Sequence, residues 1–203
     1  MALKNVNTNV ALSSKVISAA DKAALSELAT RGGQVRVHQL GGTSLIAVGK
    51  FSSKIGPLGD NHGLSEELVS ILSQAADIGA MYVEFSKDGP SVPTERAHAD
   101  LSTGHLRNAD YEVLQSISDG ERAAPIHVAD HAYGFVVDVS TAGSADALQN
   151  AGLSKEFTAL VDAAREAGAN FIDFDSDADL DPGFPEFDPV FDEEIEHEEA
   201  LRF

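Results

Sequence analysis

The chain of 203 residues has 33 acidic and 14 basic residues, which give a net charge of −19, and it contains no cysteine. The missing cysteines exclude disulfides, thiolate metal sites and cysteine nucleophiles. The negative charge disfavours contact with nucleic acid or an anionic membrane and favours basic partner surfaces. The first residues lack the basic-then-apolar order of a signal peptide, and no apolar run is long enough to span a membrane, so we expect a cytoplasmic protein.

A block in the first half of the chain recurs in the second half. Residues 63–88 align without a gap with residues 152–177, and 9 of the 26 positions are identical. The same offset of 89 residues aligns residues 12–28 with residues 101–117. It also matches single residues between these blocks, namely His38 with His127, Val48 with Val137 and Asn61 with Asn150. A fixed offset held over a whole unit indicates a tandem repeat, so the sequence predicts two copies of one domain.

Each copy is predicted to contain six elements in the order strand, helix, strand, strand, helix, strand. In the first copy they are an extended segment at 11–17, a helix at 19–31, the strands "QVRVHQL" (34–40) and "TSLIAVGKF" (43–51), a helix that begins at Ser65, and the strand "MYVEF" (81–85). In the second copy they are a segment at 100–106, a helix at 109–119, the strands "APIHVAD" (124–130) and "YGFVVDVS" (133–140), a helix that begins at Ser154, and the strand "NFIDF" (170–174). Apolar residues recur at helical spacing in both second helices, which supports the assignment.

The order of elements is that of the split-βαβ pattern, in which an antiparallel sheet carries both helices on one face. The predicted fold class is therefore α+β, a tandem duplication of a ferredoxin-like β-α-β-β-α-β unit with an acidic C-terminal tail. The predicted domains are the first repeat (11–90), the second repeat (100–181) and the tail (182–203), with a polar linker at 86–100.

Alternation along the last strand of each copy predicts which side chains leave the helical face. Tyr82 and Glu84 in the first copy, and Phe171 and Asp173 in the second, are expected to face away from the helices. We expect these open faces to be covered, either because the two copies pack together or share a sheet, or because a second chain forms a homodimer through them. Acidic strand neighbours of the two aromatic residues disfavour direct binding of nucleic acid there.

Aspartate occupies every second position from 173 to 181. Residues two apart in an extended chain lie on one side about 6.6 Å apart, so these five residues are expected to form a row of like charges, namely Asp173, Asp175, Asp177, Asp179 and Asp181. From 173 to 199 the chain has 13 acidic residues and no lysine or arginine. Such tails are usually solvated and disordered. This tail also contains Phe184, Phe187, Phe191 and Phe203, which suggests that it docks on its own domain or on a basic, grooved partner.

Two metal sites are alternatives to a purely acidic surface. The acids from Asp175 to Glu186 match the spacing of a calcium loop, but Leu180 stands at the glycine position and two prolines interrupt the frame. Three histidines, His105, His127 and His131, with Asp130, are candidate zinc or iron ligands. Histidine in a half-buried strand is more often structural, and neither a phosphate-binding glycine loop nor a nucleophile–base–orienter triad is present. We therefore predict no catalytic residue, no metal and no cofactor.

The second copy contains "STGHL", then "YGF", a helix that ends "REAG", and a strand that ends "FDSD". These segments resemble an uncharacterised domain family of plasmids, phages and other mobile elements. The matching residues are Ser102, Thr103, His105, Leu106, Tyr133, Gly134, Phe135, Arg165, Gly168, Phe174, Asp175, Ser176 and Asp177. The resemblance implies a mobile-element context and no activity, and it makes the first copy a diverged sister. The layout with an acidic tail is also similar to that of the protein inhibitor of ribonuclease E.

These observations predict a binding protein rather than an enzyme. We expect an acidic inhibitor from a phage or mobile element that mimics nucleic acid and occupies the basic surface of a host defence or nuclease protein, of the anti-restriction or anti-CRISPR type. The five aspartates are expected to make the first contact, and Phe184, Phe187 and Phe191 to anchor it, with Asp192, Glu193 and Glu194 adding charge. The alternative is an immunity or antitoxin protein that neutralises a basic toxin nuclease. A metal-dependent enzyme and a halophilic origin of the charge are further alternatives.

Overall fold

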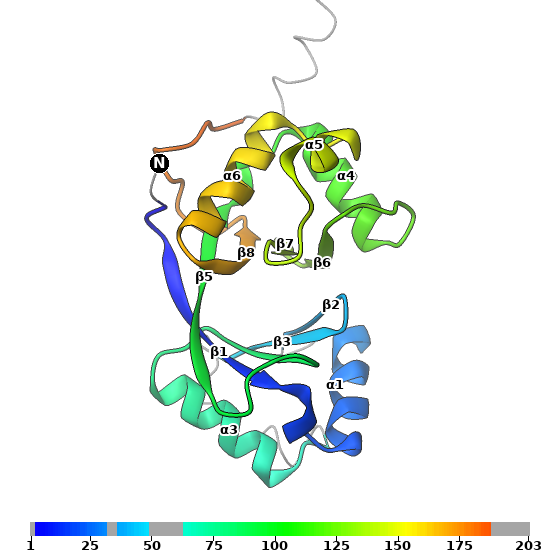
Figure 1. Ribbon diagram of the computed structural model, residues 1–203, viewed down its shortest axis with the longest axis vertical. Coiled ribbons are helices and arrows are strands. Elements are labelled where there is room, and N and C mark those ends of the chain that lie inside the picture. Colours follow the sequence, from blue (N-terminus) through cyan, green and yellow to red (C-terminus); the bar gives the residue numbers. More distant parts are fainter. Residues whose placement is uncertain (1–2, 32–35, 49–62, 188–203) are drawn as a thin grey trace, which may run out of the picture. The chain divides into compact units, whose positions relative to one another are not determined.

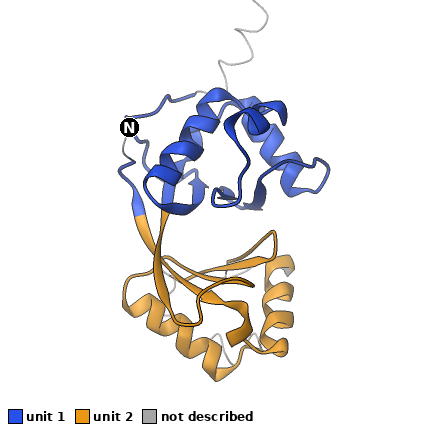
Figure 2. Cartoon of the chain, in the orientation of Figure 1, with its two compact units in different colours: residues 1–6, 99–203 blue, residues 7–98 orange. Residues whose placement is uncertain are grey.

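The computed structural model describes residues 3–31, 36–48 and 63–187. The chain divides into two compact units (Figure 2), of which unit 2 comprises residues 7–98 and unit 1 comprises residues 1–6 and 99–203. The predicted linker at 86–100 contains most of a strand, β5 (Thr94–Ser102), whose residues 94–98 belong to unit 2 and whose residues 99–102 belong to unit 1. No described helix combines the length and the apolar character needed to cross a membrane.

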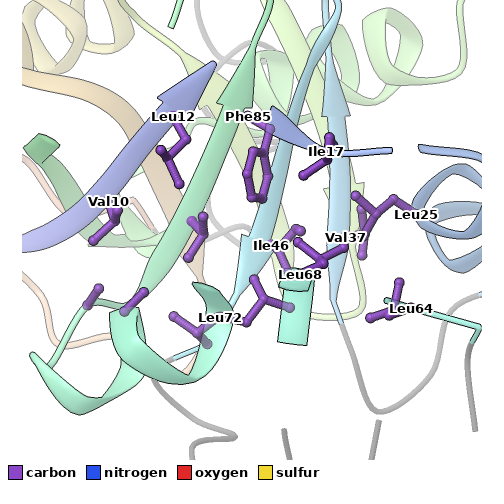
Figure 3. Close-up of a cluster of buried hydrophobic side chains, with 14 of the residues drawn as sticks. Val10, Leu12, Ile17, Leu25, Val37, Ile46, Leu64, Leu68, Leu72 and Phe85 are labelled. Carbon is purple, nitrogen blue, oxygen red and sulfur yellow. The ribbon is translucent and has the colours of Figure 1, made fainter. Parts of the chain in front are cut away.

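Unit 2 is a sheet covered on one face by two helices (Figure 1). Its elements are β1 (Val6–Ser13), α1 (Ala19–Arg31), β2 (Val37–Leu40), β3 (Thr43–Ala47), α3 (Glu66–Asp77) and β4 (Tyr82–Ser86). The strands lie in the order β2-β3-β4-β1. One core joins Leu25 of α1 and Leu72 of α3 to strand residues such as Phe85 (Figure 3), so both helices lie on the same face, as predicted.

Unit 1 repeats this order of described elements and has one further short helix after its hairpin, in a region whose counterpart in unit 2 includes residues 49–62, which lie outside the described residues. After β5 come α4 (Asn108–Ser118), β6 (His127–His131), β7 (Gly134–Asp138), α5 (Ala145–Asn150), α6 (Lys155–Glu166) and β8 (Ala169–Asp175). The strands follow the order β5-β8-β7-β6, and the β6–β7 and β7–β8 pairs are antiparallel. The sequence did not predict α5, which begins at the capping hydroxyl of Ser144.

A buried aspartate near the start of the first helix holds the start of the second helix in both units. In unit 2 the carboxylate of Asp21 accepts hydrogen bonds from the Ser65 backbone N–H at 2.7 Å and from its hydroxyl at 2.9 Å. In unit 1 the carboxylate of Asp110 accepts the same two bonds from Ser154, both at 2.6 Å. Both serines also cap their helices by accepting from a backbone N–H. The two pairs lie 89 residues apart, as the repeat offset requires.

The offset of 89 residues is wrong in the strand hairpin. Val37 pairs with Ile46 in unit 2, and the equivalent pair in unit 1 is Val128 with Val137, so the offset there is 91 residues. The same shift appears where the N–H of Val48 donates to Met81, because the equivalent donor in unit 1 is Val139, bonded to Asn170. The predicted matches of His38 with His127 and of Val48 with Val137 are therefore not structural equivalents. Asn61 lies outside the described residues.

The strand order differs from the predicted ferredoxin-like arrangement. Split βαβ units place a further strand between the two strands that a helix connects. Here β3 and β4, which are connected through α3, pair directly with each other, and β1 pairs with β4 in parallel. The sheet of unit 2 is therefore mixed rather than antiparallel. The order of elements along the chain does not determine which strands become neighbours, and this part of the prediction depended on that order alone.

The predicted faces of the last strands are confirmed. Val83 and Phe85 belong to the core beneath the helices, whereas Tyr82 makes edge-on ring contacts with His38 and His98 outside that core. On β8 of unit 1, Phe174 stacks on Phe157 of α6, and the neighbouring Asp173 instead contacts His131 of β6. Alternation of side chains along a strand accounts for both arrangements.

Candidate functional site

Three segments that carry the family-like motifs meet at one end of unit 1. The N–H of Ser176 donates to the Tyr133 carbonyl at 2.9 Å, which joins the segment after β8 to the β6–β7 turn. Thr103 lies so close to Gly134 that a Cβ on this glycine would stand 2.9 Å from the Thr103 methyl carbon. In the same way, a Cβ on Gly104 would stand 3.0 Å from a methyl carbon of Leu180. We call the region formed by residues 102–105, 131–134 and 173–187 the motif end, and residues 176–187 the strap.

His105 fastens the strap to the rest of unit 1. Its ring is buried, and its Nδ1 lies 2.7 Å from the carbonyl oxygen of Pro185, which can only accept a hydrogen bond. Its Nε2 accepts from the backbone N–H of Asp181 at 2.9 Å. The two partners fix the neutral tautomer with the proton on Nδ1. Both ring nitrogens are therefore used to hold the strap.

The phenylalanines of the strap contact their own unit. The ring of Phe184 lies 6.2 Å from the His105 ring in an edge-on arrangement. The Arg107 guanidinium lies 4.6 Å from the centroid of the Phe187 ring, a cation–π contact. The backbone N–H of Phe187 donates to Gly104 at 2.8 Å. Of the two predicted docking modes, these contacts correspond to docking on the chain's own domain. Phe191, Asp192, Glu193, Glu194 and Phe203 lie outside the described residues.

The predicted regular row of five carboxylates does not form. Strand β8 ends at Asp175, and a turn follows, in which the Asp177 N–H donates to the Asp175 carboxylate at 2.9 Å. Asp173, Asp175 and Asp181 are buried, with exposed fractions of 7%, 3% and 2%. The carboxylate of Asp181 accepts from the backbone N–H groups of Lys4 and Gly183. Only Asp177 and Asp179 of the five are exposed, because Asp173 and Asp175 lie on β8 and the Asp181 carboxylate accepts hydrogen bonds from backbone N–H groups.

The three candidate histidines are not brought together. His131 contacts Asp173 through Nε2 at 3.0 Å and accepts the Tyr133 N–H on Nδ1 at 3.3 Å. His105 binds the strap, and His127 is exposed at the other end of β6. The part of the chain that the structure describes contains no group of three side chains able to hold a metal ion. Asp181, a predicted ligand of the calcium-loop alternative, uses its carboxylate to accept hydrogen bonds from the backbone N–H groups of Lys4 and Gly183.

Most of the motif residues have a structural role. Ser102 caps the short helical turn Thr103–His105, and Arg165 donates to the carbonyls of Val139, Ala142 and Gly143, which holds the loop before α5. Gly134 is required by close approach to the Phe174 carbonyl, and Phe135 and Phe174 are core residues. Tyr133, Ser176 and Asp177 remain at the surface. The motif pattern therefore combines scaffold residues with a small exposed group.

Leu180 is a surface residue that the sequence pattern marks only as a misfit at the glycine position of a calcium loop. It belongs to the strap and lies against Gly104. Its exposed fraction is 42%, the same as that of Tyr133. The signal in the sequence was an isolated large apolar residue in an aspartate-rich run. Together with Asp177 and Asp179, these two residues give the motif end an exposed surface that is both apolar and acidic.

Nearly all of the net charge belongs to unit 1. Its residues, 1–6 and 99–203, include 24 acids and 6 bases, a net charge of −18, whereas residues 7–98 include 9 acids and 8 bases, a net charge of −1. Ten acids are exposed in the described part of unit 1, namely Glu112, Asp119, Glu121, Asp130, Asp146, Asp162, Glu166, Asp177, Asp179 and Glu186. The exposed bases described there are Lys4, Arg122 and Lys155. The surface of unit 1 is thus strongly acidic.

The fold and the motif end define a mixed α+β protein with one nearly neutral unit and one acidic unit. Residues 98–189, which cover unit 1 except for residues 1–6 and 190–203, match the model of a family of unknown function (DUF5983) C-terminal domain. That stretch is similar to an uncharacterised domain family. No curated protein and no solved structure was found to match the chain.

Proposed function

We propose that the chain is an acidic inhibitor that occupies the basic nucleic-acid-binding surface of a host defence or nuclease protein, with unit 1 as the binding part. The observation that carries this proposal is the division of charge, since unit 1 has a net charge of −18 and unit 2 of −1. Electrostatic matching of this kind gives fast, salt-sensitive association. The mobile-element context that the motifs suggested is consistent with such a role.

We also infer that the two units descend from one domain by duplication. The repeated Asp–Ser pairs and the repeated order of elements support this inference. In this view unit 1 acquired the acidic surface and the strap, while unit 2 stayed nearly neutral. The binding surface is then a property of one copy, which explains why the charge is not shared between them.

The residues expected to make the contact are the exposed acids near the strap rather than the whole aspartate series. Asp177, Asp179 and Glu186 are exposed and lie on the strap, which His105 and Asp181 hold in place. Asp173, Asp175 and Asp181 instead support that surface from within. A fixed acidic surface presents its charges without first ordering a flexible chain, which favours binding.

Neutralising Asp177, Asp179 and Glu186 together (D177N/D179N/E186Q) is expected to weaken capture of basic nucleic-acid-binding proteins from a host lysate by about tenfold, because three charges leave the contact. The matched control removes three exposed carboxylates of the same types from unit 2 (D77N/D88N/E95Q). Capture would be measured with the full chain at low and high salt, and duplex DNA would be used to displace the captured protein. Equal loss in both variants, or capture that duplex DNA does not reverse, would contradict the proposal.

A further inference from the structure

We propose that Tyr133 and Leu180 form an apolar contact centre inside the acidic surface of unit 1, and that it fits a partner loop in which arginine alternates with apolar side chains. This inference rests on the proposed function and specifies the chemistry of its partner. Both side chains are 42% exposed, although most large apolar residues of the described chain are buried.

The segments that carry the two residues both contact one turn. Gly134 follows Tyr133 and packs against Thr103, and Leu180 packs against Gly104, the next residue of the same turn Thr103–His105. The N–H of Ser176 bonds to the Tyr133 carbonyl, so the exposed acid Asp177 follows directly. The apolar and acidic side chains therefore come from two segments, residues 131–134 and the strap, and both segments contact the turn Thr103–His105.

Hydrogen bonds hold the backbone at and next to these two residues. The Tyr133 N–H donates to His131, which is in turn bonded to Asp173, and the N–H of Asp181 next to Leu180 donates to His105. Neither residue is needed to fill the core, because the rings of Phe135, Phe157 and Phe174 do so. An exposed tyrosine and an exposed leucine beside charged groups have the features of an energetic centre surrounded by a polar rim.

Charge selects the occupant. The acids Asp177 and Asp179 flank Leu180 in the sequence, and no lysine or arginine occurs between Arg165 and the end of the strap. A second copy of unit 1 would bring another net charge of about −18 to this surface. A partner segment with arginines satisfies the acids, and apolar residues between those arginines cover Tyr133 and Leu180.

Two synthetic peptides test this inference with defined probes, one of six arginines and one of six arginines interleaved with four leucines. The full chain is expected to bind the interleaved peptide about tenfold more tightly, a preference worth about 1.4 kcal/mol. The Y133A/L180S variant is expected to lose this preference while still binding hexaarginine. The control Tyr111→Ala removes another tyrosine of unit 1, 45% exposed, and should keep the preference. Circular dichroism would show that each variant remains folded.

The two proposals fail in different ways. The apolar centre is overturned if the original chain binds both peptides with equal affinity, or if Y133A/L180S keeps the preference. Neither outcome contradicts the proposal that the acidic surface binds a basic partner. The D177N/D179N/E186Q variant should weaken both peptides by a similar factor and keep their ratio. If that variant binds both peptides as tightly as the original chain, the acidic contact itself is overturned, and with it the function on which this inference rests.

Discussion

Gly134→Ala is expected to lower the free energy of unfolding of unit 1 by about 3 kcal/mol or more. Gly134 has a φ of 151°, which side chains rarely adopt, and an added Cβ would overlap the carbonyl oxygen of Phe174 on the paired strand. Because that oxygen belongs to the backbone of β8, the clash cannot be relieved by rotating a side chain. The β7–β8 pairing would have to separate at the point where the strap begins.

Gly168→Ala is the matched control. This glycine also has a positive φ, of 78°, but a Cβ there meets no atom within 4 Å. Its cost should be limited to the conformational penalty, about 1 kcal/mol. Urea unfolding monitored by circular dichroism would compare the two variants. Similar losses for both would show that backbone conformation alone, and not the close approach of Phe174, makes Gly134 necessary.

Asp21→Asn and Asp110→Asn are expected to differ in cost although the two aspartates make equivalent bonds. Burial is the largest single influence on the pKa of each carboxyl, and taken alone it would raise both pKa values. For Asp21 the hydrogen bonds from Ser18 and Ser65 together outweigh it and hold the pKa below the ordinary 3.8. For Asp110 burial prevails and the pKa lies above 3.8. At pH 7 we expect Asp21→Asn to cost about 2 kcal/mol and Asp110→Asn about 1 kcal/mol or less.

The two substitutions should also respond differently to pH. The stability that ionised Asp21 contributes is present above pH 3.8 and is lost only as pH falls through its lower folded pKa. Ionised Asp110 is penalised in the folded state, so the original protein gains stability as pH falls from 7 through its raised pKa. The cost of Asp110→Asn should therefore grow between pH 7 and pH 4. The cost of Asp21→Asn should change little over that range.

Chemical unfolding of both variants at pH 7 and pH 4, each relative to the original chain, would measure these four costs. Asp110→Ala serves as the companion variant, because it removes the acceptor from the Ser154 N–H altogether and should cost about 2 kcal/mol more than Asp110→Asn. If Asp110→Asn were the costlier asparagine variant at pH 7, or if its cost fell towards pH 4, the raised pKa of Asp110 would be contradicted.

Local patterns in the sequence predicted the elements and their faces well. Ser65 and Ser154 do cap their helices, and both helices begin one residue later. Alternation placed Phe85 and Phe174 towards the helices, where both are buried. These predictions succeeded because capping and alternation depend only on neighbouring residues.

Features that depend on distant partners were not predictable in the same way. The pairing of β3 with β4 depends on strand neighbours that lie far apart in the chain. The shift of two residues in the hairpin was hidden by the chance match of His38 with His127. The burial of Asp181 is not visible in the sequence pattern, because the backbone N–H of Lys4 that donates to its carboxylate lies 177 residues away. A regular spacing of charges says nothing about which of them a distant segment will bury.

The contribution of the first residues to unit 1 has a consequence for how the protein is made. Lys4 leaves the ribosome 177 residues before its partner Asp181, and synthesis at about 5 to 20 residues per second separates the two by about 10 to 35 s. Residues 7–98 all emerge within that interval. Unit 2 can therefore fold before the later residues that bind the N-terminal residues of unit 1 have been synthesised. We therefore expect unit 2 to fold first on the ribosome. Unit 1 can be completed only after the strap has emerged.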